Sequence, residues 1–278
     1  MFIFTIIQCM FIIKIQSKSF NRINHFRMSS ITHKPWPDIG QFRNTIQAVK
    51  EKVTFSHIDA NGEAIFDLSK PLPVLQFQGT VKLHGTNSAI GISKEGEIWY
   101  QSRSRVITLE ADNAGFVRFW KDIEYKGFLF NNLINEYSLI SKGSDILVVG
   151  EFCGANIQKG VALNKLPKMF VIFGVMVDGE WLLPEDVSRF PTAEAHNIFN
   201  VYSAETYNIE IDFNKPEIAQ DQLVKLVEKI ENTCPWGEKF GVEGVGEGAV
   251  FRPTDKDWES DTKLWFKVKT FIFYDTIL

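Results

Sequence analysis

The chain has few cysteines, and their scarcity argues against two common kinds of scaffold. Its 278 residues include only Cys9, Cys153 and Cys234, which are widely spaced and form no CxxC pair. A disulfide framework or a structural zinc site needs more cysteines or closer spacing. The composition therefore favours a reducing compartment inside the cell, with cytoplasm, nucleus and mitochondrion all left open.

Residues 1–37 lack any acidic residue, which sets this segment apart. It begins with an apolar run, MFIFTIIQCMFII, that is too short to span a bilayer and lacks the small-residue cleavage site of a secretory signal. The basic residues follow this run: Lys14, Lys18, Arg22, Arg27 and Lys34. Two interpretations stay open, a mitochondrial transit peptide and an upstream in-frame extension with Met28 as the working start. We expect residues 1–35 to be a disordered leader outside the fold, and we expect no membrane association.

The remaining chain is acidic. The formal net charge is −4, and subtracting the five basic charges of residues 1–37 leaves −9 on the rest. An acidic body argues against nonspecific coating of nucleic acid, although it leaves room for a local basic cleft.

Hydrophobic patterns after residue 36 alternate between helical and strand spacing, and no internal repeat is present. Helical spacing predicts helices over residues 42–53, 116–139 and 216–230. Short apolar or alternating runs predict strands over residues 74–81, 88–93, 98–101, 146–152, 170–177, 248–252 and 263–269. The first three strands are expected to form one meander, with Lys82 in the turn after the first strand. We therefore predict a single α+β domain over residues 36–278.

The turn Val81-Lys82-Leu83-His84-Gly85-Thr86-Asn87 carries the most specific chemical signal. A lysine in such a turn can act as a covalent nucleophile on the α-phosphate of a nucleotide, and glycine allows close approach of the backbone. Taken alone, the pattern is more typical of a plain hairpin turn with a solvent-exposed lysine.

Four further segments place charged residues at or beside predicted strand ends. They are residues 101–105 with Arg103, 149–154 with Glu151, 245–251 with Glu247, and 265–269 with Lys267 and Lys269. Strand alternation sends the last two lysines to the same face. Each segment has a simple structural interpretation: a solvated strand arginine, a carboxylate capping a turn, or an edge-strand pair of lysines that blocks aggregation. Together they match nucleotidyl transfer, in which cations neutralise phosphates and carboxylates bind ribose and a hydrated metal.

In this order the five segments resemble motifs I, Ia, III, IV and V of the covalent nucleotidyltransferases, the superfamily of polynucleotide ligases and mRNA capping enzymes. The K-x-H-G-T-N pattern, with His84, is most similar to the RNA ligase 2-type family of ATP-dependent RNA ligases. The run from Gly150 to Lys159 extends the likeness, which covers about residues 36–270. The resemblance implies an adenylyltransferase (nucleotidyltransferase) fold, with antiparallel or mixed sheets flanked by helices and the nucleotide cleft between them.

The resemblance also implies roles for individual residues. Lys82 would form the lysyl-AMP adduct from ATP, and His84 and Asn87 would place the triphosphate and the reacting ends. Arg103 would contact ribose and the RNA terminus, and Glu151 would bind the ribose hydroxyls. The remaining implied roles are a metal (Mg²⁺ or Mn²⁺) held through water by Glu247, a grip on the α-phosphate by Lys267 and Lys269, and stacking of Phe173 on adenine. Phe173 fits a core phenylalanine nearly as well.

Two positions depart from the family pattern. An aspartate commonly follows the aromatic residue, but Gly174 stands here, and an arginine found in some members is replaced by Thr80. Only nine residues follow Lys269, so no C-terminal accessory domain is expected in this chain. Three explanations stay open: a truncated gene model, a partial chain, and a minimal enzyme that depends on a protein partner for that function. The implied activity is an RNA ligase that joins 5′-phosphate and 3′-hydroxyl ends, in RNA repair. The alternatives are an enzyme that only self-adenylylates or acts on DNA nicks, and an inert RNA-end-binding module.

Overall fold

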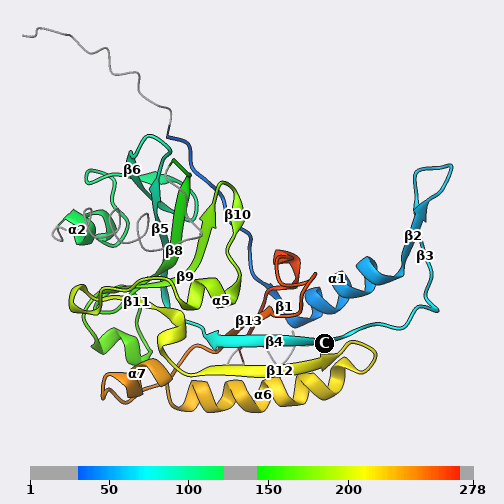
Figure 1. Cartoon of the computed structure of the whole chain (residues 1–278). Helices are drawn as coiled ribbons and strands as arrows, with labels where there is room; N and C mark the ends of the chain where they lie inside the picture. Colours follow the sequence, from blue (N-terminus) through cyan, green and yellow to red (C-terminus); the bar gives the residue numbers. More distant parts are fainter. Residues whose placement is uncertain (1–30, 122–142, 270–278) are drawn as a thin grey trace, which may run out of the picture. The chain divides into compact units, whose positions relative to one another are not determined.

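Two β-sheets dominate the part of the chain that the structure, a computed structural model, describes, residues 31–121 and 143–269 (Figure 1). The described residues from Thr32 onward belong to one compact unit. The first sheet has the strand order β1-β14-β13-β4-β12. The bounds of these strands are β1 Gly40–Gln41, β4 Val74–Val81, β12 Thr206–Asp212, β13 Ala249–Pro253 and β14 Phe266–Val268.

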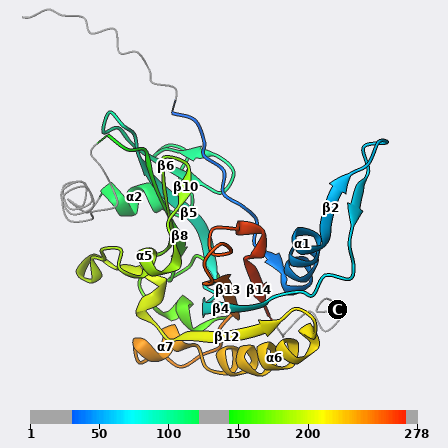
Figure 2. The ribbon, with the colours of Figure 1, turned by 45° about the vertical axis from the view of Figure 1, so that its right-hand side comes forward.

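Helices α1 (Phe42–Thr54) and α6 (Pro216–Asn232) pack on the apolar face of this first sheet (Figures 1 and 2). Pro216 is the first residue of α6. A backbone N–H at this position has no hydrogen-bond acceptor within the helix, so proline, which lacks an N–H, removes no helical hydrogen bond there. The two helices bury apolar side chains at helical spacing against Phe77, Phe251 and Phe266. Both predicted helices are confirmed. The opposite face of the sheet, which carries Thr80, Val250 and Lys267, is left free to line a cavity.

The second sheet has the order β10-β9-β8-β5-β6-β7, and β11 also pairs with β9. The bounds are β5 Gly85–Ile92, β6 Ile98–Ser102, β7 Val106–Ile107, β8 Ile146–Cys153, β9 Met169–Val177, β10 Glu180–Trp181 and β11 Ile198–Asn200. Every residue of β8 is buried, as the continuous apolar run predicts for a central strand. Short helices α2 (Phe116–Lys121), α5 (Pro184–Ser188) and α7 (Pro235–Lys239) complete the regular elements discussed below.

The predicted meander is wrong at its first connection. Strand β4 pairs with β12 and β13 in the first sheet, whereas β5 pairs with β6 and β8 in the second. The Lys82 turn therefore crosses from one sheet to the other instead of closing a hairpin. Gly85 makes the crossing possible, because a Cβ there would lie 2.4 Å from the Phe152 carbonyl oxygen. The hairpin of β5 and β6 is confirmed.

Two predicted elements have different bounds in the structure. The strand expected over residues 263–269 is limited to β14, because Thr262–Leu264 forms a 3₁₀ turn. The Asp261 side chain caps this turn by accepting a hydrogen bond of 3.1 Å from the Lys263 backbone N–H. Of the helix expected over residues 116–139, α2 is described, and residues 122–139 lie outside the described part.

A separate hairpin follows α1 in the chain. Strands β2 (Phe55–Ile58) and β3 (Ala64–Phe66) pair with each other in a two-stranded sheet of their own. Across the described ranges, no helix combines the length and apolar character that crossing a membrane would require.

Candidate active site

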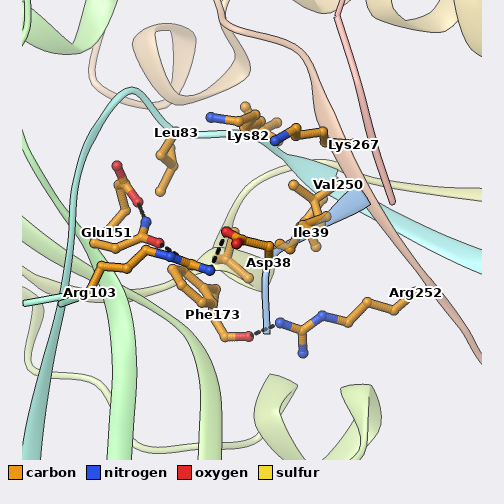
Figure 3. Close-up of a pocket in the computed structure, with 14 residues that line it drawn as sticks. Asp38, Ile39, Lys82, Leu83, Arg103, Glu151, Phe173, Val250, Arg252 and Lys267 are labelled. Atoms are coloured by element: carbon orange, nitrogen blue, oxygen red, sulfur yellow. Dashed lines mark hydrogen bonds and ion pairs between the residues drawn. The ribbon is translucent and has the colours of Figure 1, made fainter. Parts of the chain in front are cut away.

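A cavity of about 250 Å³ lies between the two sheets (Figure 3). Strands β4, β13 and β14 of the first sheet form one wall, and strands of the second sheet form the other. Figure 3 shows Lys82 and Lys267 near one end of the cavity, and Phe173 and Arg252 near the other. Fourteen residues line it: Asp38, Ile39, Thr80, Val81, Lys82, Leu83, Asn87, Arg103, Glu151, Phe173, Val201, Val250, Arg252 and Lys267.

Lys82 directly follows β4, and Glu247 holds its side chain. The Lys82 Nζ lies 2.7 Å from Glu247 Oε2, and the His84 Nδ1 lies 3.3 Å from the same oxygen. Lys269 forms an ion pair with the other carboxylate oxygen of Glu247. Lys82, His84 and Lys269 therefore all contact the carboxylate of Glu247, and the sequence analysis assigned these four residues to one site. Of the four, only Lys82 lines the cavity itself.

The pairing of β4 with β13 places Glu247 beside Lys82. Val81 is the register partner of Ala249, and the Lys82 backbone N–H donates a hydrogen bond of 2.8 Å to the Gly248 carbonyl. Gly248 has a φ of +128°, and a Cβ at this position would lie 2.2 Å from the Val268 carbonyl oxygen. Only glycine fits such a conformation and such a close approach. The glycine next to Glu247 is thus a requirement of the fold.

The electrostatic surroundings of Glu247 favour its ionised form. Burial alone would raise its pKa, but the positive charge of Lys82 and the hydrogen bonds from Lys269 and Lys82 outweigh burial and lower it. The surroundings of Lys267, in contrast, disfavour its ionised form. Burial, together with the nearby charges of Lys82 and Lys269, lowers the pKa of Lys267. The end of the cavity beside Lys82 is therefore a concentrated positive region with one ionised carboxylate.

Glu151 lies on the opposite wall, at the centre of the second sheet. Its side chain accepts a hydrogen bond from Asn87 Nδ2, and β5 and β8 place these two residues directly opposite each other. The Asn87 Oδ1 in turn accepts a hydrogen bond of 3.3 Å from Arg103 Nη1. Burial raises the pKa of Glu151 to about 7, although the charge of Lys82 and the Asn87 hydrogen bond act in the other direction.

The raised pKa of Glu151 predicts that Glu151→Gln stabilises the protein at high pH. Between 4.5, the ordinary pKa, and about 7, the folded state keeps a proton that the unfolded state has released. The free energy of unfolding of the wild type therefore falls as the pH rises through this window. Glutamine carries no charge, so we expect Glu151→Gln to be more stable by about 3 kcal/mol at pH 8 and equal to the wild type at pH 4.

Thermal unfolding at several pH values checks this prediction. Glu210→Gln, on an exposed position of β12, is the control and should change the melting temperature by no more than about one degree. A lower melting temperature of Glu151→Gln than of the wild type at pH 8 would contradict the prediction. It would show that neighbouring groups offset the free-energy cost of burying the ionised Glu151 carboxylate.

Phe173 lines the far end of the cavity and is half-buried. Its backbone carbonyl accepts a hydrogen bond of 2.8 Å from Arg252 Nη2. Its side chain also packs against the hydrophobic core, so the placement is compatible with both interpretations of this residue, stacking and core. Gly174 has little space for a longer side chain, since a Cβ there would lie 2.8 Å from the Trp181 ring. Trp181 thus fills the space beside Gly174, the position at which the resemblance led us to expect an aspartate.

Arg252 is a site residue that the sequence analysis missed. It is buried, and its guanidinium lies 3.9 Å from the centre of the Trp265 ring. Burial lowers its pKa. Strand alternation could have identified it, because Ala249 and Phe251 face the core and Val250 and Arg252 must face the other side. Asp38 was also missed, and no pattern in the sequence marks it.

The structure therefore brings all nine sequence-predicted residues to one place. Six of them line the cavity: Lys82, Asn87, Arg103, Glu151, Phe173 and Lys267. The other three, His84, Glu247 and Lys269, are joined to Lys82 through the Glu247 carboxylate. Their individual roles stay predictions.

The protein groups around Lys82 offer few ligands for a metal ion. Within residues 31–121 and 143–269, no group of three or more His, Cys, Asp or Glu side chains could hold one. A magnesium or manganese ion that arrives with a triphosphate needs only one or two carboxylates, because phosphate oxygens and water complete its shell. Glu247 fits that limited demand.

The comparisons with known proteins agree with this geometry. The family model for RNA ligase matches residues 75–269. No curated protein matches the chain. The similar solved structures include a lysine-to-methionine mutant of the Naegleria gruberi RNA ligase with AMP and Mn, with 16% identity and a TM-score of 0.52 over 86% of this chain and 58% of that chain. A glutamate-to-alanine mutant of the same ligase, also with AMP and Mn, has 15% identity and a TM-score of 0.52 over 86% and 56%.

These similarities identify the fold. A nucleotidyltransferase-type fold, with mixed sheets, flanking helices and a cavity between the sheets, is the architecture that the motif order implied. The chain spans between 56% and 58% of the length of these two ligase chains.

Proposed function

The chain belongs to the RNA ligase family, and from this premise we propose that it is an ATP-dependent RNA ligase. It would join 5′-phosphate and 3′-hydroxyl ends, as in RNA repair, through a covalent lysyl-AMP intermediate. The observation that carries the proposal is the position of Lys82, which lies at one end of a cavity between the sheets, with its amine against Glu247 and with Lys267 and Lys269 close by.

In the first step, Lys82 Nζ attacks the α-phosphorus of ATP. A P–N bond forms, the bond to the β-phosphate oxygen breaks, and pyrophosphate leaves. The proton of the amine needs an acceptor, and Glu247 Oε2 lies 2.7 Å away. Because the pKa of Glu247 is lowered, this carboxylate would pass the proton on to solvent and stay ionised.

The other side chains of the site would position ATP and stabilise its charge. Lys267, which lines the cavity beside Lys82, and Lys269 would contact the α-phosphate. Glu151 would accept hydrogen bonds from the ribose hydroxyls, and Phe173 would stack on the base. Arg103 would contact the ribose and the RNA terminus, while His84 and Asn87 would place the triphosphate and the reacting ends. ATP is favoured because solved structures of the Naegleria gruberi ligase contain ATP and Mn or AMP and Mn.

Two further transfers complete the reaction. An oxygen of the RNA 5′-phosphate attacks the α-phosphorus of the adduct, the P–N bond breaks, and the lysine recovers its proton. The 3′-hydroxyl of the other RNA end then attacks the 5′-phosphorus, AMP leaves, and the hydroxyl proton is released. The metal, Mg²⁺ or Mn²⁺, would enter with ATP, and Glu247 would hold it through water.

A labelling experiment tests the proposal. The full chain is incubated with ATP or GTP labelled at the α-phosphate, with Mg²⁺ or Mn²⁺, and the protein is separated on a gel. We expect label from ATP, at least about tenfold more than from GTP. Sealing of nicked duplex RNA and of single-stranded RNA is then measured with the same protein. A wild-type protein that takes no label under any of these conditions is not a ligase of this mechanism.

A second candidate function is self-adenylylation without complete sealing of RNA. Self-adenylylation requires only ATP and the groups around Lys82, whereas sealing also requires two RNA ends. Strong labelling from ATP without a sealed RNA product, or with sealing of DNA nicks alone, would support this alternative.

A further inference from the structure

An extended segment, residues 32–41, joins the two walls of the cavity (Figure 1, blue); we call it the strap. At its start it is bound to the second sheet. The Lys34 backbone N–H donates a hydrogen bond of 3.2 Å to Gln101 Oε1, and Gln101 Nε2 donates one of 2.7 Å to the Lys34 carbonyl. At its end β1 pairs in parallel with β14 of the first sheet. The strap is therefore held at both sheets.

Between these two attachments the strap passes along the cavity. Trp36 is buried against the second sheet, in a cluster that includes Trp99 and Val149. Two residues later, Asp38 and Ile39 line the cavity. Because Trp36 and β1 hold both flanks, the backbone of Asp38 has little freedom to move away from the site.

Asp38 is the first member of a chain of hydrogen bonds that ends at Glu151 (Figure 3). Arg103 Nη2 donates to the Asp38 carboxylate and, at 3.4 Å, to the Trp36 carbonyl. Arg103 Nη1 donates to Asn87 Oδ1, and Asn87 Nδ2 donates to Glu151. Since a guanidinium can only donate, it needs the oxygen of Asn87, and this contact determines which way the Asn87 amide points.

The contribution of Asp38 to stability should be small. Its side chain is 95% exposed, and that of Arg103 is 36% exposed. Ion pairs with this exposure contribute about 0–1 kcal/mol to folding. A role in placing the guanidinium of Arg103, whose other nitrogen contacts Asn87 inside the site, explains the position of Asp38 better than a role in folding.

We propose that Asp38 is a positioning residue of this site: acting through Arg103, it holds Asn87 and the Glu151 side of the cavity in place before the nucleotide enters. The inference rests on the proposed function, because it names ATP as the nucleotide. It adds to that function a residue of the strap, which belongs to neither of the two cavity walls and to none of the five motifs.

The first test compares Asp38→Asn with the wild type in self-adenylylation over a range of ATP concentrations. Losing a prepared binding geometry weakens ATP in the ground state and in the transition state alike. We expect KM for ATP to rise about tenfold and kcat to stay within about twofold. Asp38→Glu, which restores the carboxylate, should recover most of the loss. A fall in kcat with unchanged KM would indicate a smaller folded fraction and would overturn the proposal.

The second test is a double-mutant cycle with Arg103→Ala. If Asp38 acts through Arg103, Asp38→Asn should have no further effect once the guanidinium is absent. An equal loss in both backgrounds would mean that Asp38 contacts the nucleotide directly or only supports the fold, and either result contradicts the proposal. Glu185→Gln is the matched control, because it removes a similarly exposed carboxylate from an arginine pair of 3.0 Å, with Arg189, away from the site. It should leave KM and kcat unchanged.

Direct binding separates this inference from the proposed ligase activity. ATP affinity is measured by calorimetry with Lys82→Ala, which cannot form the adduct, with and without Asp38→Asn. The second substitution should weaken ATP binding about tenfold. Absence of labelling in the wild type would refute the ligase proposal alone, whereas equal ATP affinity of the two variants would refute the role of Asp38 alone.

Discussion

Lys82→Ala is expected to abolish transfer of label from ATP to the protein. The amine of Lys82 is the atom that would form the P–N bond, and no other group can replace a covalent nucleophile at this place. Labelling should fall at least about 1,000-fold, to the background of the gel assay. The wild-type adduct should be lost in acid and stable in alkali, as is typical of a phosphoramidate.

Lys94→Ala provides the control for this substitution. Lys94 forms an exposed pair of 3.3 Å with Asp178, away from the cavity, so its loss should leave labelling unchanged. Mass spectrometry of the labelled peptide then identifies the modified residue. Label on Lys267 or Lys269, or undiminished labelling of Lys82→Ala, would show that the assigned nucleophile is wrong.

Lys267→Ala is expected to have the second-largest effect. Its side chain lines the cavity beside Lys82, at the place where negative charge grows on the α-phosphate during attack. Removing one preorganised donor or cation from such a position costs about 100- to 1,000-fold in rate. We therefore expect kcat of self-adenylylation to fall by this factor, while ATP affinity changes much less. Single-turnover labelling at saturating ATP measures the effect directly.

Two control substitutions test whether the effect comes from Lys267 itself or from the loss of any one positive charge nearby. Lys263, in the 3₁₀ turn before β14, is not among the residues that line the cavity, and Lys263→Ala should label like the wild type. Lys267→Arg restores the charge but not the shape of an ammonium, and should recover only part of the rate. If Lys267→Ala labels within threefold of the wild type, the α-phosphate is stabilised by other groups.

The regular elements near the site were largely predictable because their patterns are local. The spacing of apolar residues in α1 and α6 follows the helical period, and the uninterrupted apolar run of β8 is typical of a central strand. The prediction of one meander failed, because periodicity shows which face of a strand is buried but not which strand lies beside it. The structure assigns β4 and β5 to different sheets, and the Lys82 turn crosses between them.

The candidate site divides in the same way. Arg103, Glu151, Glu247 and the two lysines near the C-terminal end of the described part could be selected because each belongs to a recognisable motif at or beside a predicted strand end. Strand alternation could have identified Arg252, since its neighbours Ala249 and Phe251 belong to the core. No sequence pattern could have identified Asp38, because its contact with Arg103 joins residues 65 positions apart and depends on how the strap is attached at both ends.

The sequence by itself determined the residue types and their order, and with them the RNA ligase family and the lysine expected to carry AMP. These properties reside in short segments, whose chemistry and periodicity are complete within a few residues. Only the tertiary structure decided that Glu247 joins Lys82, His84 and Lys269, that Trp181 fills the space beside Gly174, and that Asp38 reaches Arg103. Such contacts depend on strand pairing and packing between distant segments, which no local pattern of residues records.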